Sequence, residues 1–216
     1  GAFSGGLVGL TLGLFGGGGS ILAVPLMVYL VGVTDAHIAI GTSAVAVTAN
    51  AATNLITHAR RGNVRWRCAL IYSTAGVAGA FVGLLAGKAL DGGRLLFLFS
   101  LLMLVVGGLM IFTRNRVERA NAVCTIKNAP KTLGYGAGTG ALAGFFGIGG
   151  GFLIVPGLVA ATGIPLLSAI GSSLVAVTAF GLTTALSYAI SGLVDWPLAA
   201  VLVAGGAMGG IDGSLV

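Results

Sequence analysis

Two glycine-rich stretches offer the clearest chemistry in the chain. Residues 13–25 read GLFGGGGSILAVP, and residues 144–156 read GFFGIGGGFLIVP. Runs of glycine interrupt helices because their backbone is the least restricted of any residue. A helix that begins after such a break offers unpaired N–H groups and a partial positive charge at its N-terminus. Small oxyanions bind such helix ends without a charged side chain, so the two stretches predict an anion site.

Polar side chains follow each glycine-rich stretch in a second matched pair of segments. Residues 41–53 read GTSAVAVTANAAT, and residues 171–183 read GSSLVAVTAFGLT. Ser43 and Ser173 occupy corresponding positions and are expected to face the glycine stretches. Asn50 and Asn54 are four residues apart and share one face of a helix. A buried amide needs partners, so this pair is expected to line a substrate pathway.

Other hydroxyls in these segments have two possible roles, because serine and threonine also hydrogen-bond to their own helix. They are Thr42, Thr48, Ser172, Thr178, Thr183 and Thr184. The predicted substrate-binding residues are Gly16, Gly18, Gly19, Ser20, Pro25, Ser43, Asn50, Asn54, Gly147, Gly149, Gly150, Gly151, Pro156 and Ser173. No catalytic residue, metal ligand or cofactor site is predicted.

The composition indicates which kind of protein must position these residues. Of the 216 residues, 56% are hydrophobic and only 7% are charged. A soluble domain carries roughly a quarter of its residues as charged side chains, so this chain cannot cover a water-facing surface. The prediction is an all-α polytopic membrane protein.

Charge-free runs of about 18 to 20 residues cover roughly 27–30 Å as helices, which spans the hydrocarbon of a bilayer. The expected spans are 36–57, 68–87, 95–112, 164–188 and one that opens at residue 197. Short loops rich in lysine and arginine remain in the cytoplasm, which places loops 58–67 and 113–131 inside and residues 91–94 outside. The net charge of +6 therefore gathers in membrane-flanking loops, and nucleic-acid binding is not expected.

An internal duplication organises the chain. The glycine-rich stretches are 131 residues apart and the polar segments 130 apart. The second copy of the arginine-rich loop, residues 188–197, has no arginine and contains Asp195. This asymmetry favours inverted repeats, each with a broken or re-entrant glycine-rich helix. A single straight helix there would instead make the repeats parallel. The expected division is a first repeat at 1–112, a basic loop at 113–131 and a second repeat at 132–216, with the chain continuing beyond both ends.

Two further groups of residues receive structural interpretations. Gly76, Gly79 and Gly83, with their counterparts Gly206, Gly209 and Gly213, are expected to permit close helix packing. Cys68 and Cys124 lack a CxxC spacing and are expected to be thiols, neither disulfide-bonded nor metal-bound.

The doubled motif resembles the sulfite exporter TauE/SafE family of bacterial membrane permeases. The resemblance rests on Gly16, Gly18, Gly19 and Pro25, on Gly147, Gly149, Gly150 and Pro156, and on the segments 41–43 and 171–173. It implies roughly eight helices in two repeated halves. It also implies movement of sulfite, sulfonates or similar sulfur-containing anions across the cell (inner) membrane.

These observations predict a secondary transporter that moves small anions, sulfite or organosulfonates, by alternating access at the repeat interface. An anion channel and a permease for a non-sulfur organic anion are the alternatives. No nucleophile, metal set or acid–base pair lies within a span, so an enzyme is not expected. No GxxxxGK[ST] motif is present, so energy must come from a gradient. Expected partners are a small anion, the lipid bilayer and a coupling proton, which His37 could carry; the sequence does not specify an oligomeric state.

Overall fold

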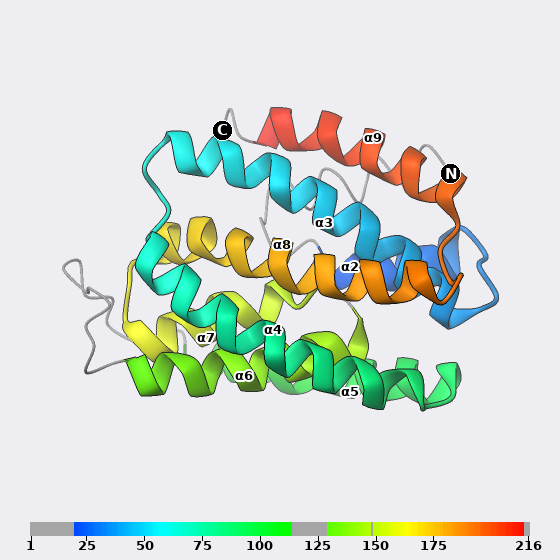
Figure 1. Cartoon of the computed structure of the whole chain (residues 1–216), viewed down its shortest axis with the longest axis horizontal. Helices are drawn as coiled ribbons and strands as arrows, with labels where there is room; N and C mark the ends of the chain where they lie inside the picture. The colour runs from blue at the N-terminus through cyan, green and yellow to red at the C-terminus, as the bar shows by residue number, and fades with distance from the viewer. Residues whose placement is uncertain (1–19, 114–128, 148, 214–216) are drawn as a thin grey trace.

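The chain folds into a bundle of helices. The structure is a computed structural model that describes residues 20–113, 129–147 and 149–213 (Figure 1). The described residues contain no strand. The helices are α2 (Ser20–Pro25), the π-helix η2 (Leu26–Leu30), α3 (Ala36–Arg60), α4 (Trp66–Lys88), α5 (Gly92–Thr113), α6 (Ala129–Phe146), α7 (Gly151–Thr162), α8 (Leu166–Ile190) and α9 (Trp196–Gly213).

Long apolar helices confirm a multi-pass membrane architecture. By length and composition, α3, α4 and α8 are each long and apolar enough to cross a membrane. Each expected span coincides with a helix whose ends lie within three residues of the expected ones, and α9 begins at Trp196, one residue before its expected start. Helix α6 begins at Ala129, inside the range expected for the second basic loop. Charged residues set these boundaries because they cannot enter the hydrocarbon cheaply.

Helices α3 and α8 form the centre of the bundle and run in opposite directions (Figure 1). Gly41, near the start of α3, lies so close to the Leu193 carbonyl beyond the end of α8 that a Cβ would not fit. Gly171 approaches the Asn63 carbonyl beyond the end of α3 in the same way. Positions 41 and 63 each lie 130 residues before 171 and 193. These reciprocal contacts are those that two inverted copies would make with each other.

Hydrogen bonds repeat this reciprocity. The Arg65 N–H, just before α4, donates to Ser172 Oγ on α8 at 2.9 Å. The Asp195 N–H, just before α9, donates to Thr42 Oγ1 on α3 at 3.0 Å. Each hydroxyl therefore satisfies one of the unpaired amides at the start of a helix. The start of each lateral helix is fixed by the central helix of the other half.

A seam of small residues joins α4 to α6. A Cβ at Gly79 or Gly83 would meet the backbone carbonyl of Ala137 or Ala141, and one at Gly140 would meet that of Gly76. The paired residue numbers rise together, so the two helices run parallel and touch along their backbones. Small residues at such spacing allow close packing in membranes, which confirms the packing role expected for Gly76, Gly79 and Gly83. The side chains of Gly209 and Gly213 lie outside the described residues.

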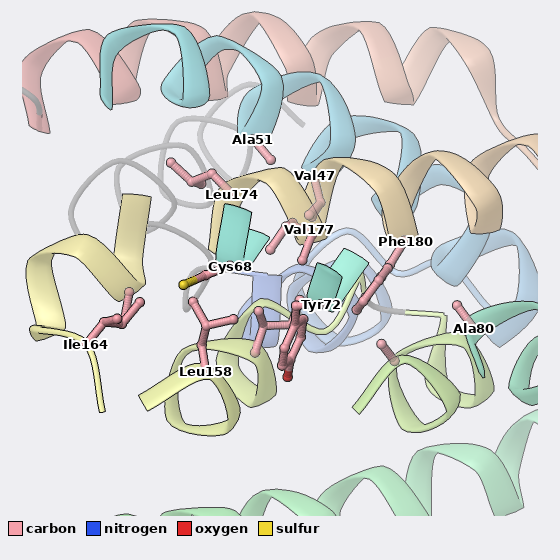
Figure 2. Packing of buried hydrophobic residues seen from close by; sticks show 14 of the residues in the cluster. Val47, Ala51, Cys68, Tyr72, Ala80, Leu158, Ile164, Leu174, Val177 and Phe180 are labelled. Carbon is pink, nitrogen blue, oxygen red and sulfur yellow. The ribbon is translucent and has the colours of Figure 1, made fainter. Parts of the chain in front are cut away.

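Buried apolar side chains from α3, α4, α7 and α8 fill the space beside this seam. In Figure 2, Val47 of α3, Tyr72 of α4, Leu158 of α7 and Val177 of α8 converge on one cluster. Each of these four side chains is at most 1% exposed. The cluster therefore fixes α7 against the central pair.

Cys68 corrects one expectation. Its side chain is buried at the start of α4, and it is disulfide-bonded, whereas the sequence was taken to predict a thiol. Spacing along the chain contains no information on which cysteines approach one another in the fold. The second cysteine, Cys124, lies outside the described residues.

The charged residues divide between the two ends of the bundle. The described charges at the end where α3 and α4 are joined are Arg60, Arg61, Arg65, Arg67 and Lys131. Those at the opposite end are Asp35, Lys88, Asp91, Arg94 and Asp195. The first end carries only positive charge, as cytoplasmic loops do, so it is the cytoplasmic end. We refer to the other as the outer end.

Replacing Gly140 with leucine is expected to disrupt the α4–α6 seam, because no side chain fits against the Gly76 backbone. We expect the melting temperature of the detergent-purified protein to fall by at least about 5 °C. The matched control is Gly138→Leu in the same helix, where a Cβ meets no neighbouring atom within 4 Å. Equal melting temperatures for the two variants would contradict the seam.

Candidate functional site

A glycine turn separates α6 from α7 in the second half of the chain. Helix α6 ends at Phe146, and α7 begins at Gly151. The φ angles of Gly147, Gly149 and Gly150 are +67°, +71° and +67°. Residues with a Cβ rarely adopt this left-handed backbone, so glycine is required here. The helix break predicted from the second glycine stretch is therefore confirmed.

The turn lies at mid-depth between the two central helices. A Cβ at Gly149 would stand 3.4 Å from Val47 of α3, 3.7 Å from Val177 and 3.8 Å from the Gly181 Cα of α8. Val47 and Val177 are each the twelfth residue of a 25-residue helix. They also correspond to each other in the duplication. The turn therefore lies where the two halves meet, halfway along both central helices.

Backbone amides dominate the polarity of this turn. Within α7, the first described amides that donate are those of Leu153 and Ile154, both to the Gly150 carbonyl at 2.9 and 3.1 Å. The amides of Gly151 and Phe152 precede any partner available within the helix. No side chain caps the helix at Gly150. Residues 149–154 are buried, so these amides and the positive end of the α7 dipole are held away from water.

The predicted glycines are not equivalent. The Gly147 N–H donates to the Gly144 carbonyl at 3.1 Å, so this residue shapes the turn and does not offer a free donor. Gly149, Gly150 and Gly151 line the start of α7. In the first half, Gly16, Gly18 and Gly19 lie outside the described residues. Helix α2 begins at Ser20, 131 residues before α7, and it contacts α7.

The two prolines act on the backbone. Pro25 and Pro156 are the sixth residues of α2 and α7, respectively. Proline lacks an N–H and interrupts the helical hydrogen bonds. Helix α2 continues beyond Pro25 as the π-helix η2, which wraps the chain back toward α3. Both residues thus shape the helices that follow the glycine stretches, and their contact with substrate stays a prediction.

The predicted serines hydrogen-bond to their own helices. Ser43 Oγ donates to the Ile40 carbonyl at 2.9 Å, and Ser173 Oγ donates to the Ile170 carbonyl at 2.7 Å. The neighbouring hydroxyls of Thr42 and Ser172 make the contacts between halves described above. Sequence alone did not indicate this division of roles, because it depends on residues about 130 positions away.

The predicted asparagines differ in their surroundings. Asn50 is 1% exposed, and neither polar atom of its amide has a partner among the described residues. Its side chain fills the space left by Gly206 of α9, as the Phe180 ring fills that of Gly76 of α4. Asn54 is half-buried one turn further along α3. The amide of Asn50 is thus a buried group that still requires a partner.

One hydroxyl from the polar segments is also unpaired. Thr184 on α8 is 1% exposed, and its Oγ1 has no partner among the described residues. A Cβ at Gly147 would stand 3.6 Å from its methyl group. Thr184 was not among the predicted site residues, although its spacing of seven from Val177 places it on the same helical face.

Charged and aromatic residues gather at the outer end, away from the turn. Lys88 Nζ donates to the Ser187 carbonyl, Ser187 Oγ and Ser191 Oγ at 2.8, 2.9 and 2.7 Å, which caps the C-terminus of α8. The ammonium also lies 4.7 Å from the centre of the Tyr188 ring. His37 stacks on the same ring with centroids 6.3 Å apart, and its Nε2 lies 3.2 Å from the Leu90 carbonyl. These contacts tie α3, α4 and α8 together.

Two other kinds of site find little support. A small pocket in the described part of the chain is lined by Val24, Ile40, Leu95, Leu96, Phe99 and Phe146. Its side chains are all apolar, so it cannot hold an anion. Among the described residues, no group of three or more histidine, cysteine or acidic side chains is arranged to hold a metal.

The multi-pass bundle, with a buried helix start between two opposed central helices, defines a membrane transport protein. The chain belongs to the sulfite exporter TauE/SafE family, whose pattern it matches over residues 1–216. It is therefore a membrane transporter, located in the cell membrane.

Relatives from several bacteria have names that agree with this assignment. A probable membrane transporter protein of Xylella fastidiosa (strain 9a5c) is 56% identical over 99% of this chain and 82% of its own length. The probable membrane transporter protein YunE of Bacillus subtilis is 28% identical over 98% of this chain and 85% of its own length. A probable membrane transporter protein of Haemophilus influenzae is 30% identical over 87% and 72%, respectively. No solved structure matches the chain.

The glycine turn predicts a selective effect of Gly149→Ala on transport. A Cβ at this φ costs about 1–2 kcal/mol, and relief of the strain would move the amides at the start of α7. We expect the initial rate of methanesulfonate uptake into proteoliposomes to fall about tenfold or more.

The matched control is Gly192→Ala, at φ +70° in an outer loop where a Cβ meets no atom within 4 Å. It imposes the same backbone strain far from the turn and should leave uptake within about twofold of the unaltered protein. Similar losses in both variants would show that the effect is general destabilisation.

Proposed function

We propose that this transporter carries small sulfur-containing anions, such as sulfite or organosulfonates, by alternating access at the interface between its halves. One observation carries the proposal: the start of α7, with its unpaired amides, is buried at mid-depth between α3 and α8. The proposed contacts on this side are Gly149, Gly150 and Gly151. Their counterparts Gly16, Gly18, Gly19 and Ser20 are proposed to complete the site.

The charge of the substrate follows from what surrounds the start of α7. Backbone amides and the helix dipole supply roughly half a positive charge. All described lysine and arginine side chains belong to the two ends of the bundle. The cost of removing an ion from water rises with the square of its charge, so a dianion would be dehydrated without sufficient compensation. We therefore propose a monovalent substrate, such as bisulfite or an organosulfonate.

The pairing of the halves supports alternating access. Helices α3 and α8 are antiparallel and make reciprocal contacts through residues 130 positions apart. Inverted repeats allow two halves to exchange conformations, which opens a central site first to one side and then to the other. We propose that the halves are inverted repeats of this kind. The buried asparagine Asn50 lies at the α3–α9 contact, which such an exchange would rearrange.

Uptake into proteoliposomes tests this function. We expect saturable uptake of methanesulfonate, a monovalent anion, and uptake of the dianion sulfate at least about tenfold slower at equal concentration. Liposomes without protein provide the background. Flux proportional to concentration, without saturation, would indicate the alternative of an anion channel.

Two outcomes would overturn the proposal. Uptake of neither sulfonate nor sulfite above background would remove the substrate class, and saturable uptake of acetate alone would assign a non-sulfur organic anion. Equal transport of sulfate and methanesulfonate would remove the preference for monovalent substrates. Imposing a pH gradient across the same liposomes tests the proposed coupling proton, because only a coupled protein would concentrate the sulfonate.

A further inference from the structure

Thr184 is exceptional among the hydroxyls of α8. Thr178 Oγ1 donates to the Leu174 carbonyl at 2.7 Å, and Thr183 Oγ1 donates to the Ala179 carbonyl at 2.9 Å. Thr184 is more deeply buried than either, yet its Oγ1 has no partner among the described residues. A buried hydroxyl without a partner weakens a fold, so its presence calls for a function.

The position of Thr184 connects this hydroxyl with the start of α7. Val177, Gly181 and Thr184 lie on one face of α8, and each lies beside a glycine of the turn. Val177 and Gly181 flank Gly149, and Thr184 flanks Gly147. Thr184 is therefore the polar residue on the wall of α8 that faces the turn, displaced toward the outer end.

The duplication provides a second, independent indication. The residue 130 positions before Thr184 is Asn54, so both halves place a hydrogen-bonding side chain at this position. The position one turn earlier is occupied by Asn50 in one half and Phe180 in the other, so polarity is not general along this face. Because α3 and α8 are antiparallel, Asn54 lies toward the cytoplasmic end and Thr184 toward the outer end.

We propose that Thr184 is a further substrate-binding residue, whose hydroxyl donates to an oxygen of the anion held by the first amides of α7. This inference rests on the proposed function. The tetrahedral sulfonate group presents three oxygens, so amide donors and a hydroxyl can bind it together. The resting structure leaves the hydroxyl unpaired because its partner is the transported anion.

Removal of the hydroxyl distinguishes this role from simple packing. Thr184→Val keeps the shape of the side chain, and Thr184→Ser keeps the donor. The matched control is Thr178→Val, which removes a hydroxyl that bonds to its own helix on the same element. We expect Thr184→Val to raise the KM for methanesulfonate uptake about tenfold to a hundredfold. The serine variant and the Thr178 control should stay within about threefold of the unaltered protein.

Thermal stability provides a measurement that does not depend on transport. If the hydroxyl serves substrate alone, the valine variant without substrate should melt at or above the temperature of the unaltered protein, because an unpaired buried group is gone. Methanesulfonate should raise the melting temperature of the unaltered protein and not that of the valine variant.

The outcomes separate the two proposals. A KM for Thr184→Val equal to that of the unaltered protein, with uptake still lost in Gly149→Ala, would overturn the role of Thr184 and leave the proposed function standing. Absence of saturable sulfonate uptake by the unaltered protein would overturn both.

Discussion

The structure depends on one constraint: a backbone N–H buried in a membrane must find an acceptor. Lipid supplies none, so an interrupted helix survives only where protein or substrate satisfies its free groups. The turn at residues 147–150 creates such groups in the middle of the protein. Glycine makes the turn possible, and the seam between α4 and α6 holds the end of α6 at the right depth. The rest of the bundle can be understood as support for this one unsatisfied element.

The two halves are fastened by reciprocal contacts. Each central helix approaches the loop beyond the other through a glycine, and each provides a hydroxyl to the first amide of the other half's lateral helix. A movement of one half therefore shifts the helix starts of the other. Such coupling suits a protein that must rearrange its halves around a central site without separating them.

Much of the fold could be predicted from the sequence because charge and length delimit membrane helices strictly. Residues 58–67 and 91–94 interrupt uncharged runs, and the observed helices end close to them. The break at residues 147–150 was also predictable, since consecutive glycines have no better use inside a helix. The packing role of Gly76, Gly79 and Gly83 followed from their spacing.

The partners of individual side chains could not be predicted in the same way. Helical spacing shows which residues share a face, but not which element that face meets. Asn50 and Asn54 were assigned together, whereas Asn50 is buried against Gly206 of α9 and Asn54 is only half-buried. The hydroxyl of Thr184 stands out only when its neighbours are seen bonded to their own helix. The disulfide at Cys68 likewise depends on proximity in space.

The most direct test removes a single backbone donor. Replacing Phe152 with its α-hydroxy analogue converts one amide at the start of α7 into an ester and leaves the side chain unchanged. The same replacement at Leu158, whose amide lies inside α7, is the control. We predict that the ester at 152 weakens methanesulfonate binding about tenfold or more, whereas the ester at 158 leaves the Kd unchanged. An unchanged Kd for the ester at 152 would contradict anion binding by the backbone of α7.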